Sequence, residues 1–223
     1  MKYLFISEAT DEKTIGRKYH QCKGMPDGMG LTYKWFEQPN SMTKLTNDEF
    51  PDFEPELIFE LEEKAILTDA VSPSNISAKG FLINQKVKDI LQHFNLMEHK
   101  YYPATLIIKG NRLEYFWLHF KDNSDYFLSN IDYKKTRFHL CNLLFQKTDD
   151  VTIDSYKEYI EKKMPISYIS ASKLTLNEVL IEKEYDLFYI RGMFLYPFVS
   201  SRLIEVLKAY NVTGFEFRKQ SIL

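Results

Sequence analysis

The stretches LINQKVKDILQHFNL, residues 82–96, and FVSSRLIEVLKAYNV, residues 198–212, match each other in chemistry along their length without a gap. Both carry apolar residues at positions i, i+3, i+4 and i+7, which are Val87, Ile90, Leu91 and Phe94 in the first stretch and Leu203, Val206, Leu207 and Tyr210 in the second. This spacing places the apolar side chains on one face of a helix. The sequence therefore predicts two amphipathic helices within an internal repeat.

Polar residues mark both ends of each expected helix. Asn84 and Ser200 stand just before the apolar pattern, where such side chains accept a hydrogen bond from a free N–H of the first turn. Asn95 and Asn211 stand at the other end, where asparagine tolerates the left-handed backbone that stops a helix. Each helix is thus expected to be a short, capped element with a strand on either side.

Strand patterns outnumber helix patterns along the whole chain. Residues 105–120 predict a β-hairpin that turns at Gly110-Asn111. Further expected elements are strands at 1–7, 125–131, 136–145 and 186–195, a short helix at 151–163, a turn-rich loop at 24–30, and the two repeated strand-helix-strand units at 80–103 and 196–219. These elements predict an α+β fold with an antiparallel or mixed sheet and few helices.

Length and composition predict a packed globular protein. The chain has 223 residues, 44% of them hydrophobic and 27% charged, with 8 glycines and 8 prolines. The sequence divides into a strand-rich N-terminal region with an acidic segment, residues 1–75, and a region with the internal repeat, residues 76–223. We expect the two regions to pack as one compact unit.

The same numbers disfavour several classes of protein. The formal net charge is −2, so the chain offers no general attraction to the phosphates of nucleic acid. No apolar stretch approaches the roughly 20 residues that a membrane span needs, and the apolar N-terminal run is far shorter than the core of a signal peptide. Only two cysteines occur, which excludes a disulfide scaffold. A cytoplasmic protein without nucleic-acid or membrane partners is expected, and its oligomeric state is left open.

Residues 48–63 form an acidic segment without a basic residue. Its carboxylates are Asp48, Glu49, Asp52, Glu54, Glu56, Glu60, Glu62 and Glu63. Two interpretations stay open: a solvated face of the fold, or an acidic surface offered to a basic partner. In the second interpretation the candidate partner-binding residues are Asp52, Glu54, Glu56, Glu60, Glu62 and Glu63.

The sequence contains none of the common catalytic signatures. The phosphate-binding pattern GxxxxGK[ST], the dinucleotide pattern GxGxxG, the nucleophile elbow GxSxG and the zinc pattern HExxH are all missing. We therefore assign no catalytic, cofactor-binding or metal-binding residues and expect no enzyme and no cofactor. One open alternative is a zinc site, if His20-Gln21-Cys22 and His139-Leu140-Cys141 meet, since i and i+2 residues of a strand share a face.

The second repeated unit also suggests a family. Residues 198–207 followed by Thr213-Gly214-Phe215-Glu216-Phe217 resemble the C-terminal signature of bacterial immunity proteins encoded beside polymorphic toxins, a vSxxlxxxL helix followed by tGxxF. The likeness covers roughly residues 70–223, although Asn84 and Glu98 stand in the first unit where the second has Ser200 and Gly214. The resemblance implies a small cytoplasmic protein that binds and neutralises a cognate protein toxin and catalyses no reaction.

A second hypothesis comes from a different class of protein. Sheet and helices of two repeated units could enclose a cleft, and such clefts hold small ligands or substrates in many enzymes. This alternative is an enzyme or small-ligand-binding protein whose pocket lies between the repeats.

Overall fold

The structure of the chain is a computed structural model, and it describes residues 3–17, 19–24, 37–74, 76–142, 147–169, 173–176, 184–191 and 196–219. The chain folds into two compact units. The first comprises Met1–Ile6, Asn123–Ser201 and Phe217–Leu223, and the second comprises Ser7–Asp122 and Arg202–Glu216. The predicted boundary between residues 75 and 76 lies inside the second unit, because strands on either side of it pair, with Ala70 opposite Ile83.

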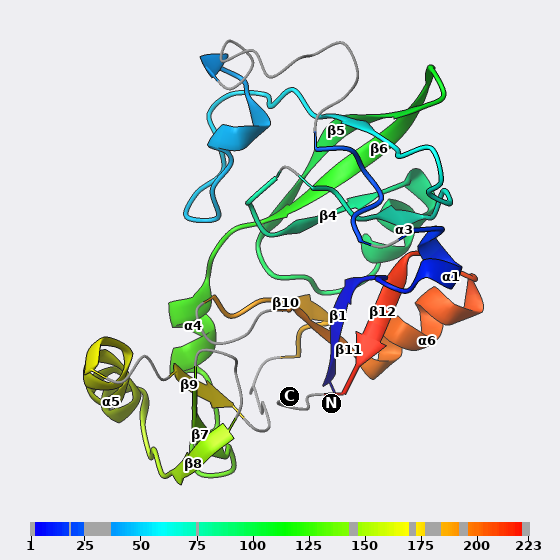
Figure 1. The fold of residues 1–223 in the computed structure, drawn as a ribbon. Helices are drawn as coiled ribbons and strands as arrows, with labels where there is room; N and C mark the ends of the chain where they lie inside the picture. The colour runs from blue at the N-terminus through cyan, green and yellow to red at the C-terminus, as the bar shows by residue number, and fades with distance from the viewer. Residues whose placement is uncertain are drawn as a thin grey trace. The chain divides into compact units, whose positions relative to one another are not determined.

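The second unit is built on a mixed sheet (Figure 1). Its strands are β2 (Ile58–Glu60), β3 (Ala70–Val71), β4 (Gly80–Ile83), β5 (His99–Ile108) and β6 (Asn111–Phe120). Their order is β2-β5-β6-β4-β3, with β2 parallel to β5 and the other pairs antiparallel. The predicted α+β fold with few helices and mixed or antiparallel sheets is confirmed.

The hairpin of β5 and β6 turns one residue earlier than the sequence predicted. Lys109 and Gly110 form the turn, both with positive φ (47° and 82°), and Ile108 pairs with Asn111. Two consecutive positive φ values are typical of the turn whose twist matches that of the flanking strands. Glycine takes the second of these positions without strain, which leaves Asn111 free to begin β6.

The two faces of this sheet bury different partners. On one face the side chains of Tyr102, Leu106 and Trp117 pack into a core with residues from preceding segments, among them Met42 of the short helix η1 (Met42–Lys44). The short helix α1 (Glu12–Ile15) belongs to the same unit, and its Ile15 is buried. On the other face lies α3 (Gln85–Leu91), whose Lys88 amino group stands 3.7 Å from the centre of the Phe116 ring. The sheet is therefore covered on both sides.

Helix α3 begins as predicted but ends differently. The Asn84 side chain accepts a hydrogen bond from the backbone N–H of Val87 at 3.1 Å, which confirms it as the N-cap. Asn95 does not take the predicted left-handed backbone; α3 ends at Leu91, and Gln92 closes it in the right-handed region. The last carbonyls already accept hydrogen bonds from nearby N–H groups, so the chain needs no left-handed residue at position 95.

Helix α6 (Ser201–Ala209) ends with the predicted left-handed residue. Asn211 has φ 50°, its N–H donates to the Lys208 carbonyl, and the N–H of Val212 donates to the Leu207 carbonyl, both at 2.9 Å. These are the two bonds of a Schellman motif. At the other end, the hydroxyl of Ser200, the predicted N-cap, donates to Asp186 Oδ1 at 2.7 Å.

The buried face of α6 is rotated from the predicted stripe. Leu203, Ile204 and Leu207 are buried, whereas Tyr210 is 62% exposed. Tyr210 lies beyond the last helical residue, at the point where the Schellman motif turns the chain away from the helix axis. The helical periodicity therefore stops one residue too early to bury it.

The first unit contains two sheets. One has the order β10-β11-β1-β12, and the other is antiparallel with the order β8-β7-β9. The strands are β1 (Tyr3–Glu8), β7 (Phe138–Cys141), β8 (Lys147–Val151), β9 (Lys173–Leu176), β10 (Leu187–Phe188), β11 (Phe198–Ser200) and β12 (Phe215–Arg218), of which β1 and β12 continue into the second unit. The helices are α4 (Ser124–Ser129) and α5 (Tyr156–Ile169).

One predicted strand of the first unit is wrong. Residues 125–131 form α4 and the turn after it, with Phe127 and Leu128 both buried and Tyr126 exposed. A strand would send neighbouring residues to opposite faces, whereas a helix can bury two in succession. Phe127 stacks on Phe188 with ring centres 5.0 Å apart, and this tertiary contact favours the helix.

The remaining predictions in the first unit were right in type and inexact in extent. The strand predicted at 136–145 is β7, and the strand predicted at 186–195 is the two-residue β10; residues 143–146 and 192–195 lie outside the described residues. The helix predicted at 151–163 is α5, which starts later, after β8. Most of the predicted loop at 24–30 also lies outside the described residues.

Both predicted strand-helix-strand successions occur, as β4-α3-β5 and β11-α6-β12. In each sheet one further strand lies between the two, β6 in the first case and β1 in the second. That the two segments are copies of one repeated unit stays a prediction.

Candidate functional site

The acidic segment begins at a firm attachment to the sheet of the second unit. Nε2 of His119 lies 2.7 Å from the Thr46 carbonyl oxygen, and the Asn47 side chain donates to the carbonyls of Phe120 (2.7 Å) and Lys79 (3.2 Å). The Lys79 N–H returns a bond to Asn47 Oδ1 at 2.8 Å. These bonds fix the chain immediately before Asp48.

The far end of the segment is part of the sheet. The Leu57 carbonyl accepts a hydrogen bond from the N–H of Thr105, and the N–H of Leu61 donates to the Ile107 carbonyl. Leu57, Phe59 and Leu61 are buried in the core, so the residues between them point outward. Alternation along an extended chain therefore brings Glu56, Glu60 and Glu62 to the surface of the sheet.

Two of the six candidate carboxylates are neutralised within the protein. Glu60 pairs with Lys23 at 2.7 Å, and Glu62 pairs with Arg17 at 2.6 Å. Both cations come from the N-terminal segment, which runs beside residues 60–62 through the Cys22–Leu61 bridge. Glu60 and Glu62 therefore have a structural partner, which the local sequence around them does not reveal.

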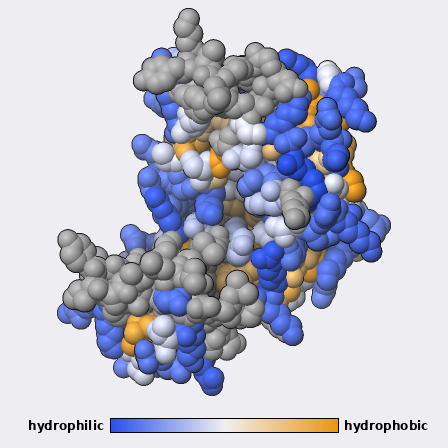
Figure 2. Space-filling model, in the orientation of Figure 1, coloured by the Kyte–Doolittle hydropathy of each residue, from blue (hydrophilic) through white to orange (hydrophobic). Residues whose placement is uncertain are grey.

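The other four candidates, Asp52, Glu54, Glu56 and Glu63, are exposed. Within the part of the chain that the structure describes, no ion pair involves any of them. The space-filling view shows hydrophilic residues over most of the described surface on its face, with hydrophobic residues in small groups between them (Figure 2). These four exposed carboxylates are therefore accessible to a partner or to solvent.

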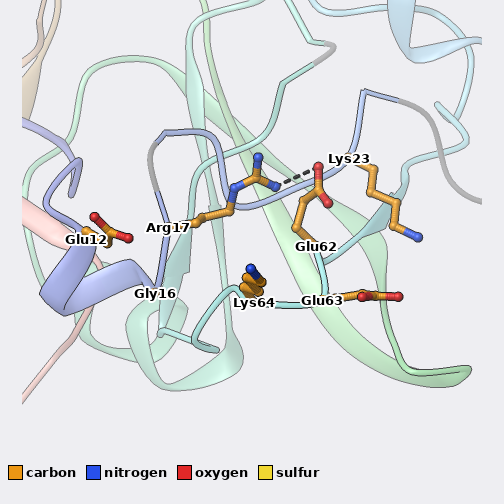
Figure 3. Close-up of a pocket in the computed structure, with 7 residues that line it drawn as sticks. All are labelled: Glu12, Gly16, Arg17, Lys23, Glu62, Glu63 and Lys64. Atoms are coloured by element: carbon orange, nitrogen blue, oxygen red, sulfur yellow. Dashed lines mark ion pairs between the residues drawn. The ribbon is translucent and has the colours of Figure 1, made fainter.

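A groove with mixed charge lies beside Glu62 (Figure 3). It has a volume of about 430 Å³, and its charged lining residues are Glu12, Glu62, Glu63, Arg17, Lys23 and Lys64. Figure 3 shows Arg17 reaching across to Glu62, the pair already described. Because acidic and basic residues are equal in number, this groove offers no strong preference for a charged ligand.

A second groove crosses β2, β5 and β6 near the turn of the hairpin. It has a volume of about 710 Å³ and is lined by Asn40, residues 54–58, residues 103–105 and residues 112–114. Sheet register fixes its width, because Ile58 lies opposite Thr105, and Thr105 lies opposite Glu114. We call this the hairpin groove.

The hairpin groove is acidic and has an apolar contact point. Its charged lining residues are Glu54, Glu56 and Glu114 on the acidic side and Arg112 on the basic side. Leu113 beside them is 38% exposed. Excess negative charge around an exposed apolar side chain is suited to a basic protein surface rather than to an anionic metabolite.

Sequence reasoning found half of this groove and missed the other half. Glu54 and Glu56 belong to the acidic segment, but Arg112 and Glu114 lie on β6, far along the chain. The available signal was the run Asn111 to Glu114 directly after the hairpin turn, where polar residues mark a solvent-exposed strand end.

The two His-x-Cys pairs do not give a metal site in the described part of the protein. Cys22 is buried in the core of the second unit, and this burial raises the pKa of its thiol to about 12. His139 is buried in β7 of the first unit, and the side chain of Cys141 lies outside the described residues. No group of three or more His, Cys, Asp or Glu side chains among the described residues is arranged to hold a metal ion.

The segments on which the ligand-pocket hypothesis rests touch directly in the second unit. Phe81 and Phe215 pack edge to face with ring centres 5.2 Å apart, and the Arg202 guanidinium lies 5.5 Å from the centre of the Phe94 ring. Neither of the two grooves described above is lined by residues of α3 or α6. No observation on the described residues favours a ligand site between the helices.

Comparison with known proteins does not assign the chain to a family. No family model matches it, and no curated protein matches it either. Among the described residues, no helix combines the length and the apolarity that crossing a bilayer requires.

Proposed function

We propose that this chain is an immunity protein of the bacterial cytoplasm, which binds a cognate protein toxin and neutralises it by occupying the toxin surface. The observation that supports the proposal best is the division of the acidic segment. Glu60 and Glu62 are used in internal ion pairs, whereas Asp52, Glu54, Glu56 and Glu63 are exposed without such partners among the described residues. Opposed charges on two proteins raise the rate of their association and select partners.

The hairpin groove is the proposed centre of the surface that binds the toxin. Glu54 and Glu56 line it together with Glu114, and Leu113, which also lines the groove, supplies an exposed apolar side chain. Protein interfaces combine a small apolar centre with a polar rim, and a basic toxin surface would complement these charges. The proposed mode of action needs no catalytic residue, since a bound immunity protein blocks its toxin by covering it.

The partner can be found by co-purification. The chain is isolated from its native cells after a wash at moderate salt, and the proteins that remain bound are identified by mass spectrometry. We expect a stoichiometric protein partner that is toxic when expressed alone and harmless when this chain is expressed with it. The proposal would be overturned if co-expression of this chain did not protect cells from the partner, or if a small molecule was retained in place of a protein.

The surface can be tested with matched variants once the partner is in hand. In Glu54→Gln/Glu56→Gln, affinity at low salt is expected to fall about tenfold, because two charges that face the partner are lost. The control is Asp89→Asn/Glu205→Gln, which removes two exposed carboxylates from α3 and α6. The difference between the two proteins is expected to shrink at high salt, where surface charges are screened. Equal affinity of both variants at low salt would exclude the acidic segment as the contact.

A further inference from the structure

Three polar atoms in the core of the second unit have no hydrogen-bond partner among the described residues. They are Oη of Tyr102, Nε1 of Trp117 and Nδ1 of His119. The three residues are 9%, 2% and 0% exposed, so bulk solvent does not reach these atoms. A buried polar atom without a partner destabilises the folded state, so three in one core region call for a physical explanation.

The three side chains are neighbours on one face of the sheet. Tyr102 on β5 lies directly opposite Trp117 on β6, and His119 follows Trp117 by two residues. Residues two apart on a strand, and residues opposite each other on paired strands, share a face. The rings of Tyr102 and His119 have their centres 5.9 Å apart.

Gly80 shows where the indole N–H lies. It is the partner of His119 on β4, and a Cβ atom at Gly80 would stand 2.8 Å from Cε2 and 2.7 Å from Cζ2 of Trp117. Nε1 is bonded to Cε2, so the indole N–H lies one bond from an atom that faces Gly80, the Cα partner of His119. A side chain at position 80 would exclude the indole from this place.

The hydrogen-bonding roles of the three atoms differ. Nε2 of His119 lies 2.7 Å from the Thr46 carbonyl oxygen, which can only accept, so Nε2 carries a proton. Burial lowers the pKa of His119, which leaves Nδ1 as an acceptor without a proton. The Trp117 N–H is a donor only, and the Tyr102 hydroxyl both donates and accepts.

We propose that one internal water molecule binds among Tyr102, Trp117 and His119. The water accepts a hydrogen bond from the Trp117 N–H and donates one to His119 Nδ1, and its third bond is with the Tyr102 hydroxyl. Internal waters typically make about three hydrogen bonds to buried polar groups that lack other partners. One donor, one acceptor and one group of either kind are the set that a water molecule satisfies.

The water site has a consequence for the acidic segment. By bonding to Nδ1 it holds His119 in the tautomer whose Nε2–H donates to the Thr46 carbonyl, two residues before Asp48. The site thus supports the attachment from which the exposed carboxylates extend. It depends on the core of the second unit alone and is independent of the proposed function.

The proposal is tested by NMR on the full chain labelled with ¹⁵N. We expect a cross-peak between the Trp117 indole proton and water, and His119 nitrogen shifts that show the proton on Nε2. A cross-peak can also arise by relay through the exchanging Tyr102 hydroxyl. Tyr102→Phe separates the two cases: the cross-peak persists if a water is bound and disappears if the hydroxyl relays it.

The control variant removes a hydroxyl from the same face without touching the site. Tyr115→Phe deletes the group that donates to the Thr68 carbonyl at 2.7 Å, and it is expected to leave the cross-peak and the His119 tautomer unchanged. If a variant fails to fold, the wild-type spectrum can still overturn the proposal, because the proposal requires both the cross-peak and a proton on Nε2 of His119. Absence of the wild-type cross-peak, a proton on Nδ1, or loss of the cross-peak in Tyr102→Phe each overturns the proposal.

Discussion

Asp69 and Thr213, 144 positions apart in the chain, hold each other by reciprocal hydrogen bonds. Oδ2 of Asp69 accepts from the Thr213 N–H at 2.8 Å and from its hydroxyl at 2.9 Å, and the Asp69 N–H donates to Thr213 Oγ1 at 3.1 Å. The same carboxylate accepts from the Asn84 side chain at 2.8 Å and from Lys86 at 3.2 Å. One carboxylate therefore ties the start of α3 to the segment between α6 and β12.

The first prediction removes the charge of this carboxylate. Asp69→Asn is expected to lower the free energy of unfolding by about 1–3 kcal/mol, because the new amide N–H₂ faces donors and cannot accept from them. Urea denaturation at neutral pH measures the effect. The matched control is Asp89→Asn on the exposed side of α3, for which a change within about 0.5 kcal/mol is expected. Equal stability of the two variants would contradict the role of Asp69.

The pH dependence of the same pair has a definite sign. Burial by itself would raise the pKa of Asp69, but hydrogen bonds from Thr213, Asn84 and Lys86 outweigh it and hold the pKa below the ordinary 3.8. A carboxyl whose pKa is lower in the folded state stabilises that state at pH values above the pKa of the unfolded state. This stabilisation is lost as the pH falls through the pKa of the folded state. The difference in free energy of unfolding between the wild type and Asp69→Asn should therefore become smaller below about pH 4.

The second prediction concerns the glycine beside Thr213. Gly214 has φ 91°, and a Cβ atom there would collide with the carbonyl oxygen of Ala70 and lie 2.8 Å from Thr68 Oγ1. Gly214→Ala is therefore expected to destabilise the protein by about 2–4 kcal/mol, from backbone strain and the clash together. Thermal denaturation gives the measurement. Gly24→Ala is the control, because open space surrounds the added methyl group there; a similar loss in both variants would rule out this explanation.

The Thr-Gly pair of the immunity-like signature thus has a physical explanation in this chain. Thr213 supplies the hydrogen bonds to Asp69, and Gly214 allows the backbone to approach Ala70. Both roles are structural, so the signature identifies how the segment after α6 is held and gives no contact residue for a toxin.

Local patterns in the sequence predicted the elements whose stability is local. The cap at Asn84, the left-handed Asn211 and the hairpin between β5 and β6 depend on residues within a few positions of each other. The pairing of Glu60 with Lys23 and of Glu62 with Arg17 joins residues far apart in sequence, so the charge pattern of residues 48–63 could not reveal it. For the same reason the charge pattern predicted a candidate acidic surface but could not distinguish the carboxylates with an internal ion pair, Glu60 and Glu62, from the others.

Residues 125–131 show a local pattern that predicted the wrong element. Their composition suits a strand, yet the chain forms α4, because Phe127 stacks on Phe188 from a distant part of the chain. Tertiary packing can override the intrinsic conformational preference of a short segment, because the free energy of that preference is small.

The third prediction tests the buried face of α6. Leu207 is 1% exposed, and Leu207→Asp places an unpaired charge in the core, at an expected cost of about 3–5 kcal/mol. Lys208 is exposed, so Lys208→Asp is expected to change the stability by less than about 1 kcal/mol. Circular dichroism during thermal denaturation compares the two. If Leu207→Asp melted like the wild type, the assignment of the buried face would be wrong.

The fourth prediction concerns Glu8, the last residue of β1. Desolvation raises the pKa of this half-buried carboxyl to about 7, and the attraction of Lys79 only partly opposes it. The folded state therefore binds a proton that the unfolded state releases between pH 4.5 and about 7. The contribution of Glu8 to stability is fully present below pH 4.5, and it is lost as the pH rises through the pKa of Glu8 in the folded state.

Glu8→Gln removes this titration. Relative to the wild type, the variant should gain about 1 kcal/mol or more as the pH rises from 4.5 to 8, because glutamine never has to carry the half-buried charge. Urea denaturation of both proteins at pH 4.5 and pH 8 gives the difference, in which the titrations of His20, His119 and His139 cancel because both proteins contain them. Glu114→Gln, at an exposed position of β6, is the control and should show no such gain. A Glu8→Gln difference that is the same at both pH values would mean that solvent reaches the carboxyl and that β1 ends in a wetter environment than the structure describes.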